Sequence, residues 1–101
     1  SMSKGIIKIT YKKRSATSIY NIGLYIEDKG YPITANKFID KLYEFGNSLA
    51  NFPEKYPVCR KKVWAMRYLR CAVFKKDYIF IYKLINDELI IYNVVHTRTI
   101  A

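Results

Sequence analysis

Two short polar links constrain the fold of this chain more than any other feature. A three-residue link at 75–77 (KKD) separates a β-prone run at 66–74 from a second run at 78–85. A two-residue link at 86–87 (ND) then leads into a third run at 88–95. Links this short join strands only as antiparallel neighbours, because parallel neighbours need a long crossover. The C-terminal half is therefore predicted to form a three-stranded antiparallel meander.

The N-terminal half has the pattern of one strand followed by two amphipathic helices. Residues 6–11 form a short β-prone run. Residues 19–26 carry isoleucines at helical spacing, and Gly30 suits the end of this helix because glycine tolerates the left-handed conformation. A second helix is predicted from Pro32 to the breaking pair Phe52-Pro53. Its apolar stripe consists of Ala35, Phe38, Ile39, Leu42, Phe45 and Leu49.

These elements together predict an α+β fold with two layers, formed by a single domain over residues 1–101. Side chains alternate between the two faces of a strand. In the run 78–85, one face is expected to carry Tyr78, Phe80, Tyr82 and Leu84. In the last run, Leu89, Ile91, Asn93 and Val95 are expected to oppose Ile90, Tyr92, Val94 and His96. One face of the sheet should pack on the helices, and the other, aromatic and basic, should suit a partner.

Positive charge is concentrated in one stretch of this chain, whose formal net charge is +10. The segment 55–76 has eight basic residues and no acidic one. They are Lys55, Arg60, Lys61, Lys62, Arg67, Arg70, Lys75 and Lys76. Such a one-sided stretch indicates a polyanion or an acidic protein as partner, although a solvated basic face is the alternative.

Several classes of protein lack support in this sequence. The apolar runs are too short for a membrane helix, and lysines interrupt any leader near the start, so a cytoplasmic location without membrane contact is expected. Cys59 and Cys71 are then expected to be free thiols, and no metal or cofactor is expected. No phosphate-binding glycine loop or serine nucleophile motif is present.

The order of these elements and two local segments resemble the RelE/ParE family of toxins. NSLANFPEKYPV at 47–58 is similar to the family's exit from the second helix into an exposed loop. KKDYIFIYKLINDELIIYNVVHTR at 75–98 is similar to its C-terminal hairpin and terminal basic or histidine motif. The resemblance implies the toxin of a type II toxin–antitoxin system, bound by a cognate antitoxin. RelE-like members cut messenger RNA on the ribosome, whereas ParE-like members inhibit DNA gyrase and are not enzymes.

Two departures from the nuclease pattern favour the ParE branch. RelE-like members tend to have an arginine after the aromatic residue that starts the third strand, but here Ile79 follows Tyr78. The chain ends at Ala101, so the later tyrosine of the ribosome-dependent nucleases has no counterpart. The preferred hypothesis is therefore a gyrase-binding toxin without enzymatic activity. A ribosome-dependent nuclease and a non-toxic basic binding module stay open as alternatives.

The candidate site residues are the cations and aromatics of the C-terminal half. Contacts with a target or antitoxin are assigned to Arg67, Arg70, Lys75, Lys76, Tyr78, Tyr82, His96 and Arg98. In the nuclease alternative, Arg70, His96 and Arg98 would be catalytic. Arg67 and Arg70, three apart in the predicted strand, should face opposite sides. His96 could act as a general base, but a structural role that orders the C-terminus is preferred because no partner for catalysis is evident.

Overall fold

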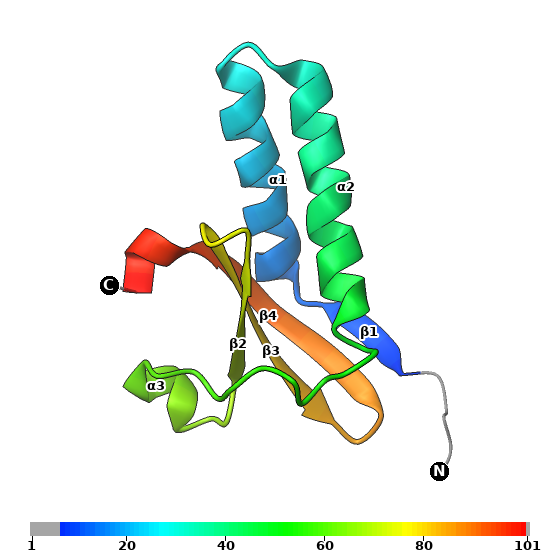
Figure 1. The fold of residues 1–101 in the computed structure, drawn as a ribbon, viewed down its shortest axis with the longest axis vertical. Coiled ribbons are helices and arrows are strands. Elements are labelled where there is room, and N and C mark those ends of the chain that lie inside the picture. Colours follow the sequence, from blue (N-terminus) through cyan, green and yellow to red (C-terminus); the bar gives the residue numbers. More distant parts are fainter. Residues whose placement is uncertain (1–6, 101) are drawn as a thin grey trace.

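A computed structural model describes residues 7–100 as a four-stranded sheet with a helical hairpin on one face (Figure 1). The elements are β1 (Lys8–Tyr11), α1 (Lys13–Asp28), α2 (Pro32–Ser48), the short α3 (Lys62–Ala65), β2 (Arg70–Phe74), β3 (Tyr78–Ile85), β4 (Glu88–His96) and a 3-10 helix, η1 (Thr97–Ile100). The predicted α+β fold is confirmed. Within residues 7–100, no helix is long and apolar enough to cross a membrane.

The sheet has the strand order β1-β4-β3-β2. β2, β3 and β4 form the predicted antiparallel meander, and both short links are turns. β1 pairs with β4 in parallel, so the sheet is mixed. The parallel pairing is possible because residues 12–87, which include the hairpin, β2 and β3, form the long connection that parallel strands need. Ile6, which the sequence placed in the first strand, lies outside the described residues.

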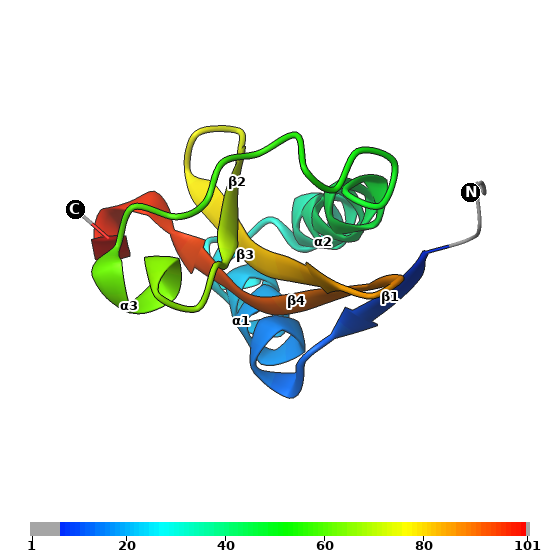
Figure 2. The same ribbon diagram turned by 90° about the horizontal axis from the view of Figure 1, so that it is seen from below.

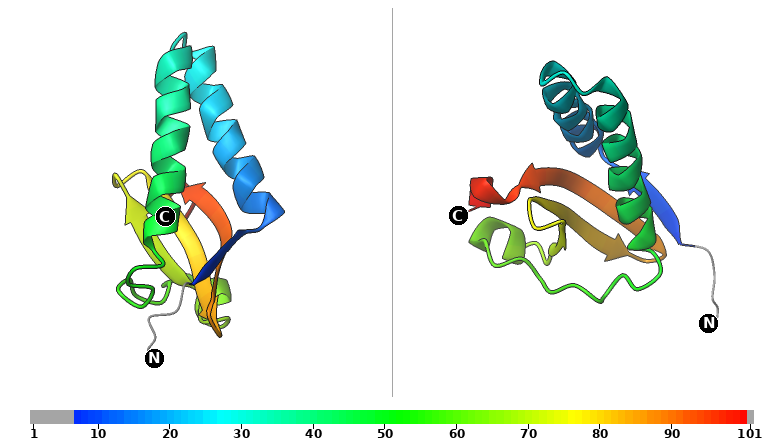
Figure 3. Two further views of the ribbon diagram at one scale, coloured as in Figure 1. Left: turned by 90° about the vertical axis from the view of Figure 1, so that its right-hand side faces the viewer. Right: turned by 45° about the horizontal axis from the view of Figure 1, so that its top comes forward.

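The hairpin covers one face of the sheet and extends beyond its end. Figure 3 shows α1 and α2 side by side, in agreement with their direct packing. Ile19, Leu42 and Leu49 point from the helices into the core, where they meet Phe80 and Tyr82 of β3. All five side chains are almost fully buried. The predicted stripe of α2 and the face of β3 that carries Phe80 and Tyr82 therefore form the main core.

The opposite face of the sheet carries a second, smaller core. Figure 2 shows α2 and α3 on opposite sides of the central strands. Cys59 and Leu69, which flank α3, are buried against Ile79 and Ile81 of β3. The prediction of an open aromatic face is thus wrong for this part of the sheet. The segment 57–69 covers it, because two adjacent isoleucines would otherwise expose their apolar surface to water.

The predicted strand at 66–74 is also shorter than expected. Residues 62–65 form α3, and Tyr68 has a left-handed backbone with a φ of 58°, so β2 begins only at Arg70. Arg67 consequently lies outside the strand. The expected placement of Arg67 and Arg70 on opposite faces of one strand is therefore wrong.

A β-bulge in β4 reverses the alternation of its side chains. Ile81 pairs with Asn93 but Tyr82 pairs with Ile91, which leaves Tyr92 as the extra residue. Leu89 and Ile91 share one face as predicted, and this face packs on the helices. Beyond the bulge the assignment is wrong: Val94 packs in the helix-side core, and Val95 packs with Tyr92 in the second core.

Buried tyrosine hydroxyls make the stability of this fold sensitive to alkaline pH. Tyr82 has no exposed surface, and its hydroxyl donates a hydrogen bond of 2.6 Å to the carbonyl of Pro53. Burial raises the pKa of Tyr82 to about 12 from its ordinary 10.0. The folded state therefore holds this proton more tightly than the unfolded state. The stability linked to it is complete below pH 10 and is lost as the pH rises towards 12.

We expect Tyr82→Phe to flatten the loss of stability between pH 10 and 12. At neutral pH the variant should lose about 1 kcal/mol, because the Pro53 carbonyl loses its donor. Denaturant unfolding at a series of pH values measures both effects. Tyr20→Phe, which changes a tyrosine that is 62 % exposed, is the matched control. If the free energy of unfolding falls equally steeply above pH 10 in Tyr82→Phe and in the unchanged protein, Tyr82 is not the source of the alkaline loss of stability.

Candidate functional site

A groove at one end of the sheet brings together three of the predicted site residues. Tyr78 begins β3, His96 ends β4 and Arg98 lies in η1. The groove has a volume of about 560 Å³. Its lining consists of Ser18, Asn21, Ile22, Tyr25, Tyr78, Val94, His96, Arg98 and Thr99. We call it the C-terminal groove.

His96 organises the end of the chain. Its Nδ1 accepts a hydrogen bond of 3.1 Å from the backbone N–H of Arg98, and its carbonyl accepts one of 2.7 Å from Thr99 Oγ1. Its ring also packs edge-on against Tyr78, the residue opposite it in the sheet, with 5.4 Å between the centroids. A neutral His96 in this arrangement carries its proton on Nε2. Nδ1 could act as a base only if the turn into η1 opened, so these contacts fit the structural role.

Tyr78 offers the groove a hydroxyl that stays protonated. Burial raises its pKa above the ordinary value, and the nearby Asp77 and Tyr25 raise it further. A tyrosine whose pKa is raised cannot act as a base near neutrality. Tyr78 can donate a hydrogen bond to a partner while its ring supplies apolar contact.

The turn between β2 and β3 places two further predicted cations beside this groove. Lys75 and Lys76 are exposed and adopt left-handed backbones, with φ values of 51° and 54°. The carbonyl of Asp77 accepts a hydrogen bond of 2.8 Å from the backbone N–H of Thr97, which joins this turn to η1. The C-terminal groove thus has positive charge on the turn and on η1.

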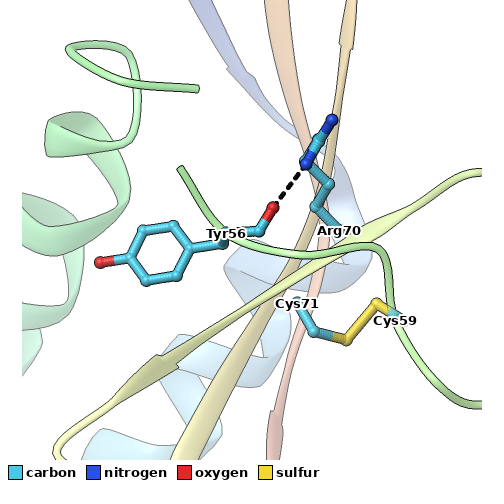
Figure 4. The surroundings of a disulfide bond; sticks show 4 residues. All are labelled: Tyr56, Cys59, Arg70 and Cys71. Atoms are coloured by element: carbon cyan, nitrogen blue, oxygen red, sulfur yellow. Dashed lines mark hydrogen bonds between the residues drawn. A yellow bond between two sulfur atoms is a disulfide. The ribbon is translucent and has the colours of Figure 1, made fainter. Parts of the chain in front are cut away.

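Arg70 and Tyr82 lie outside the C-terminal groove, and both donate hydrogen bonds to the loop that follows α2. Arg70 Nη1 donates to the carbonyl of Tyr56 at 2.5 Å (Figure 4). It also donates to the carbonyl of Glu54 at 3.5 Å. Tyr82 is fully buried and bonded to Pro53. The assignment of Tyr82 to a partner contact is therefore wrong, because its side chain is not accessible. Arg70 is half-buried, and its fork is engaged by backbone carbonyls.

Cys59 and Cys71 form a disulfide, so the expectation of free thiols is wrong (Figure 4). The bond joins the loop before α3 to β2. Two backbone hydrogen bonds run beside it, from Cys59 N–H to the Leu69 carbonyl and from Cys71 N–H to the Pro57 carbonyl. The basic segment 60–67 is therefore a loop closed at its base. Sequence spacing could not reveal this pairing, because it depends on how α3 folds back over the sheet.

The residues of α1 in the C-terminal groove were missed by the sequence analysis. Tyr25 is 63 % exposed and faces the groove together with Asn21 and Ser18. The sequence places these residues on a helix of the hairpin. Only the packing of α1 against β4 brings them next to His96.

The fold and the groove define a small, basic α+β protein whose accessible functional side chains are suited to contacts with a macromolecule. Over residues 9–101 the chain matches the family model of the ParE toxin of the type II toxin–antitoxin system parDE. The chain belongs to this family, which confirms the resemblance seen in its sequence.

A solved structure described as a chromosomal ParDE toxin–antitoxin system from P. aeruginosa has the same fold. Its TM-score is 0.76 at 12 % sequence identity, and the alignment covers 90 % of this chain and 96 % of that chain. At this identity the likeness shows the fold alone. A comparison with curated proteins found no match.

Opening the disulfide should loosen the basic segment more than the rest of the fold. We expect Cys59→Ser/Cys71→Ser to lower the free energy of unfolding by about 3 kcal/mol, the size typical of a loop this short. Amide hydrogen exchange should accelerate mainly within 57–69. Reductant added to the double variant, where it has no disulfide to break, is the control. Equal unfolding midpoints for the oxidised and reduced protein would contradict this role.

Proposed function

We propose that this protein is the toxin of a type II toxin–antitoxin module, that it arrests growth by binding DNA gyrase, and that a cognate antitoxin neutralises it. The observation that carries the proposal is its membership of the ParE toxin family over residues 9–101. The C-terminal groove, which has both apolar and cationic side chains, also supports the proposal.

The separation of Arg70 from His96 counts against a nuclease that uses these two residues together, whereas Arg98, the third candidate, lies in the same groove as His96. Arg70 pairs with Tyr82 across the sheet, whereas His96 pairs with Tyr78. These positions are four residues apart along β3, which is roughly 13 Å. The Arg70 fork is bonded to the loop after α2, and His96 Nδ1 is bonded to the turn of η1. RNA cleavage would need a base and a phosphate-binding cation at one point.

The C-terminal groove suits an antitoxin segment that is both acidic and amphipathic. Tyr25 and Tyr78 offer apolar surface at its centre, while Lys75, Lys76 and Arg98 supply positive charge around it. Aromatic and arginine side chains are the ones that most often dominate protein interfaces. The net charge of +10 further favours an acidic partner by accelerating its approach. This position replaces the sheet face that sequence analysis favoured, since the segment 57–69 covers much of that face.

Induced expression in a bacterial host tests the proposed target. We expect growth arrest with an early fall in DNA synthesis, measured by separate labelling of DNA and protein. Purified protein should also inhibit supercoiling by gyrase. If protein synthesis falls first, the ribosome becomes the target. Soluble, folded protein without any arrest would overturn the proposal and leave a non-toxic binding module.

Arg98→Ala should reduce toxicity without reducing stability. The Arg98 side chain is exposed, and the hydrogen bond to His96 uses its backbone N–H, which the variant keeps. Loss of one charge-assisted contact of about 1.5–3 kcal/mol should weaken target or antitoxin binding at least tenfold. Lys41→Ala, at an exposed lysine of α2, removes the same charge and is the control. An Arg98→Ala protein with full toxicity and full antitoxin binding would exclude Arg98 from both interfaces.

A further inference from the structure

A second, smaller pocket lies where the start of α1 approaches α3 and the bulge of β4. It adjoins the C-terminal groove, because Ser18 of that groove is hydrogen-bonded to Asn93 of this pocket. Figure 2 shows the first turn of α1 and α3 on the same side of β4. The pocket has a volume of about 320 Å³. Its lining consists of Lys12, Arg14, Trp64, Arg67, Leu69, Ile81, Tyr92 and Asn93. We call it the Tyr92 pocket.

Two cations of this pocket share one aromatic ring. Lys12 Nζ lies 5.8 Å from the centroid of the Tyr92 ring, and Arg67 Cζ lies 5.2 Å from it. The negative charge of a ring face attracts cations and offsets part of their mutual repulsion. Arg14 adds a third positive side chain. None of the eight lining residues is acidic, so the pocket has no carboxylate of its own to neutralise these charges.

The β-bulge adds a neutral donor to the same pocket. Asn93 Oδ1 accepts hydrogen bonds from Ser18 Oγ at 2.7 Å and from the backbone N–H of Val94 at 2.8 Å. Both bonds use the oxygen of the amide and fix its orientation. The two N–H donors on Nδ2 take part in neither bond. The pocket thus combines three cations with an oriented amide, which is the donor set that an oxyanion requires.

Positive charge continues from this pocket onto the closed basic loop. Lys61 Nζ lies 4.9 Å from the centroid of the Trp64 ring, and Trp64 lines the pocket. Arg60 and Lys62 are exposed beside Lys61. A single anion would use only the pocket, whereas a ligand with regularly repeated negative charges would also use this neighbouring surface. Nucleic acid has such a backbone, and arginine forks match the geometry of its phosphates.

We propose that the Tyr92 pocket binds a backbone phosphate of a nucleic-acid strand, with the basic loop holding the neighbouring phosphates. Arg14 and Arg67 bind the phosphate oxygens, Lys12 adds charge and Asn93 donates from its amide. A nucleic-acid strand is favoured over an acidic peptide because the cations continue from the pocket along Arg60, Lys61 and Lys62, which suits regularly spaced phosphates. This contact goes beyond the proposed function and requires neither gyrase nor an antitoxin.

Fluorescence anisotropy with a labelled 20-nucleotide single-stranded DNA tests this proposal on the full chain alone. We expect Arg14→Gln/Arg67→Gln to weaken binding at least tenfold at low salt. The slope of log affinity against log salt should become shallower by about 1.4, the value for two lost contacts to a single strand. Lys37→Gln/Lys41→Gln, on exposed lysines of α2, removes the same charge and should change both quantities much less.

Two further measurements separate the proposal from its rivals. Arg67 packs on Tyr92, so Arg14→Gln alone serves as a second variant if the double variant unfolds. A peptide of twenty alternating Glu and Ser residues should compete with the DNA only weakly. Equal losses of DNA affinity in the pocket and α2 variants would overturn the proposal and indicate a diffuse charge effect. Tighter binding of the peptide than of the DNA would also overturn it. Growth arrest and gyrase inhibition are scored separately, so failure of the proposed function leaves this result unaffected.

Discussion

The burial of β3 on both faces is the constraint on which the rest of this structure depends. Phe80 and Tyr82 face the helical hairpin, while Ile79 and Ile81 face the segment that carries α3. All four side chains are at most 4 % exposed. A strand with two apolar faces needs a cover on each, because every exposed side chain of this size would cost roughly 2 kcal/mol. The helical hairpin covers one face, and the segment 57–69 covers the other.

The second cover buries only Cys59 and Leu69, with Trp64 packed against them, and specific bonds also hold it. The disulfide between Cys59 and Cys71 closes the base of the basic loop. Just before it, the carbonyls of Pro53 and Tyr56 accept hydrogen bonds from Tyr82 and Arg70. A segment with so many like charges would otherwise tend to separate from the sheet. These bonds fix the backbone at the two ends of the loop that carries the cations.

The accessible functional side chains consequently lie in two regions. The C-terminal groove joins α1, the turn at 75–77 and η1, and it combines aromatic with cationic side chains. The Tyr92 pocket joins the start of α1 to α3 and combines three cations with apolar and aromatic side chains. Both regions depend on β4, whose last residue orders η1 and whose bulge orients Asn93.

The sequence by itself determined the element order, the antiparallel meander and which side chains of β3 share a face. These features rest on local physics: the length of a link decides the direction of neighbouring strands, and periodicity decides which side chains share a face. Family membership was also accessible, since NSLANFPEKYPV and the C-terminal hairpin carry it. Only the tertiary structure decided the parallel pairing of β1, the bulge at Tyr92, the disulfide, and the roles of Arg70 and Tyr82. Each of these depends on residues far apart in the chain, and no local spacing encodes which of them meet once both faces of β3 are covered.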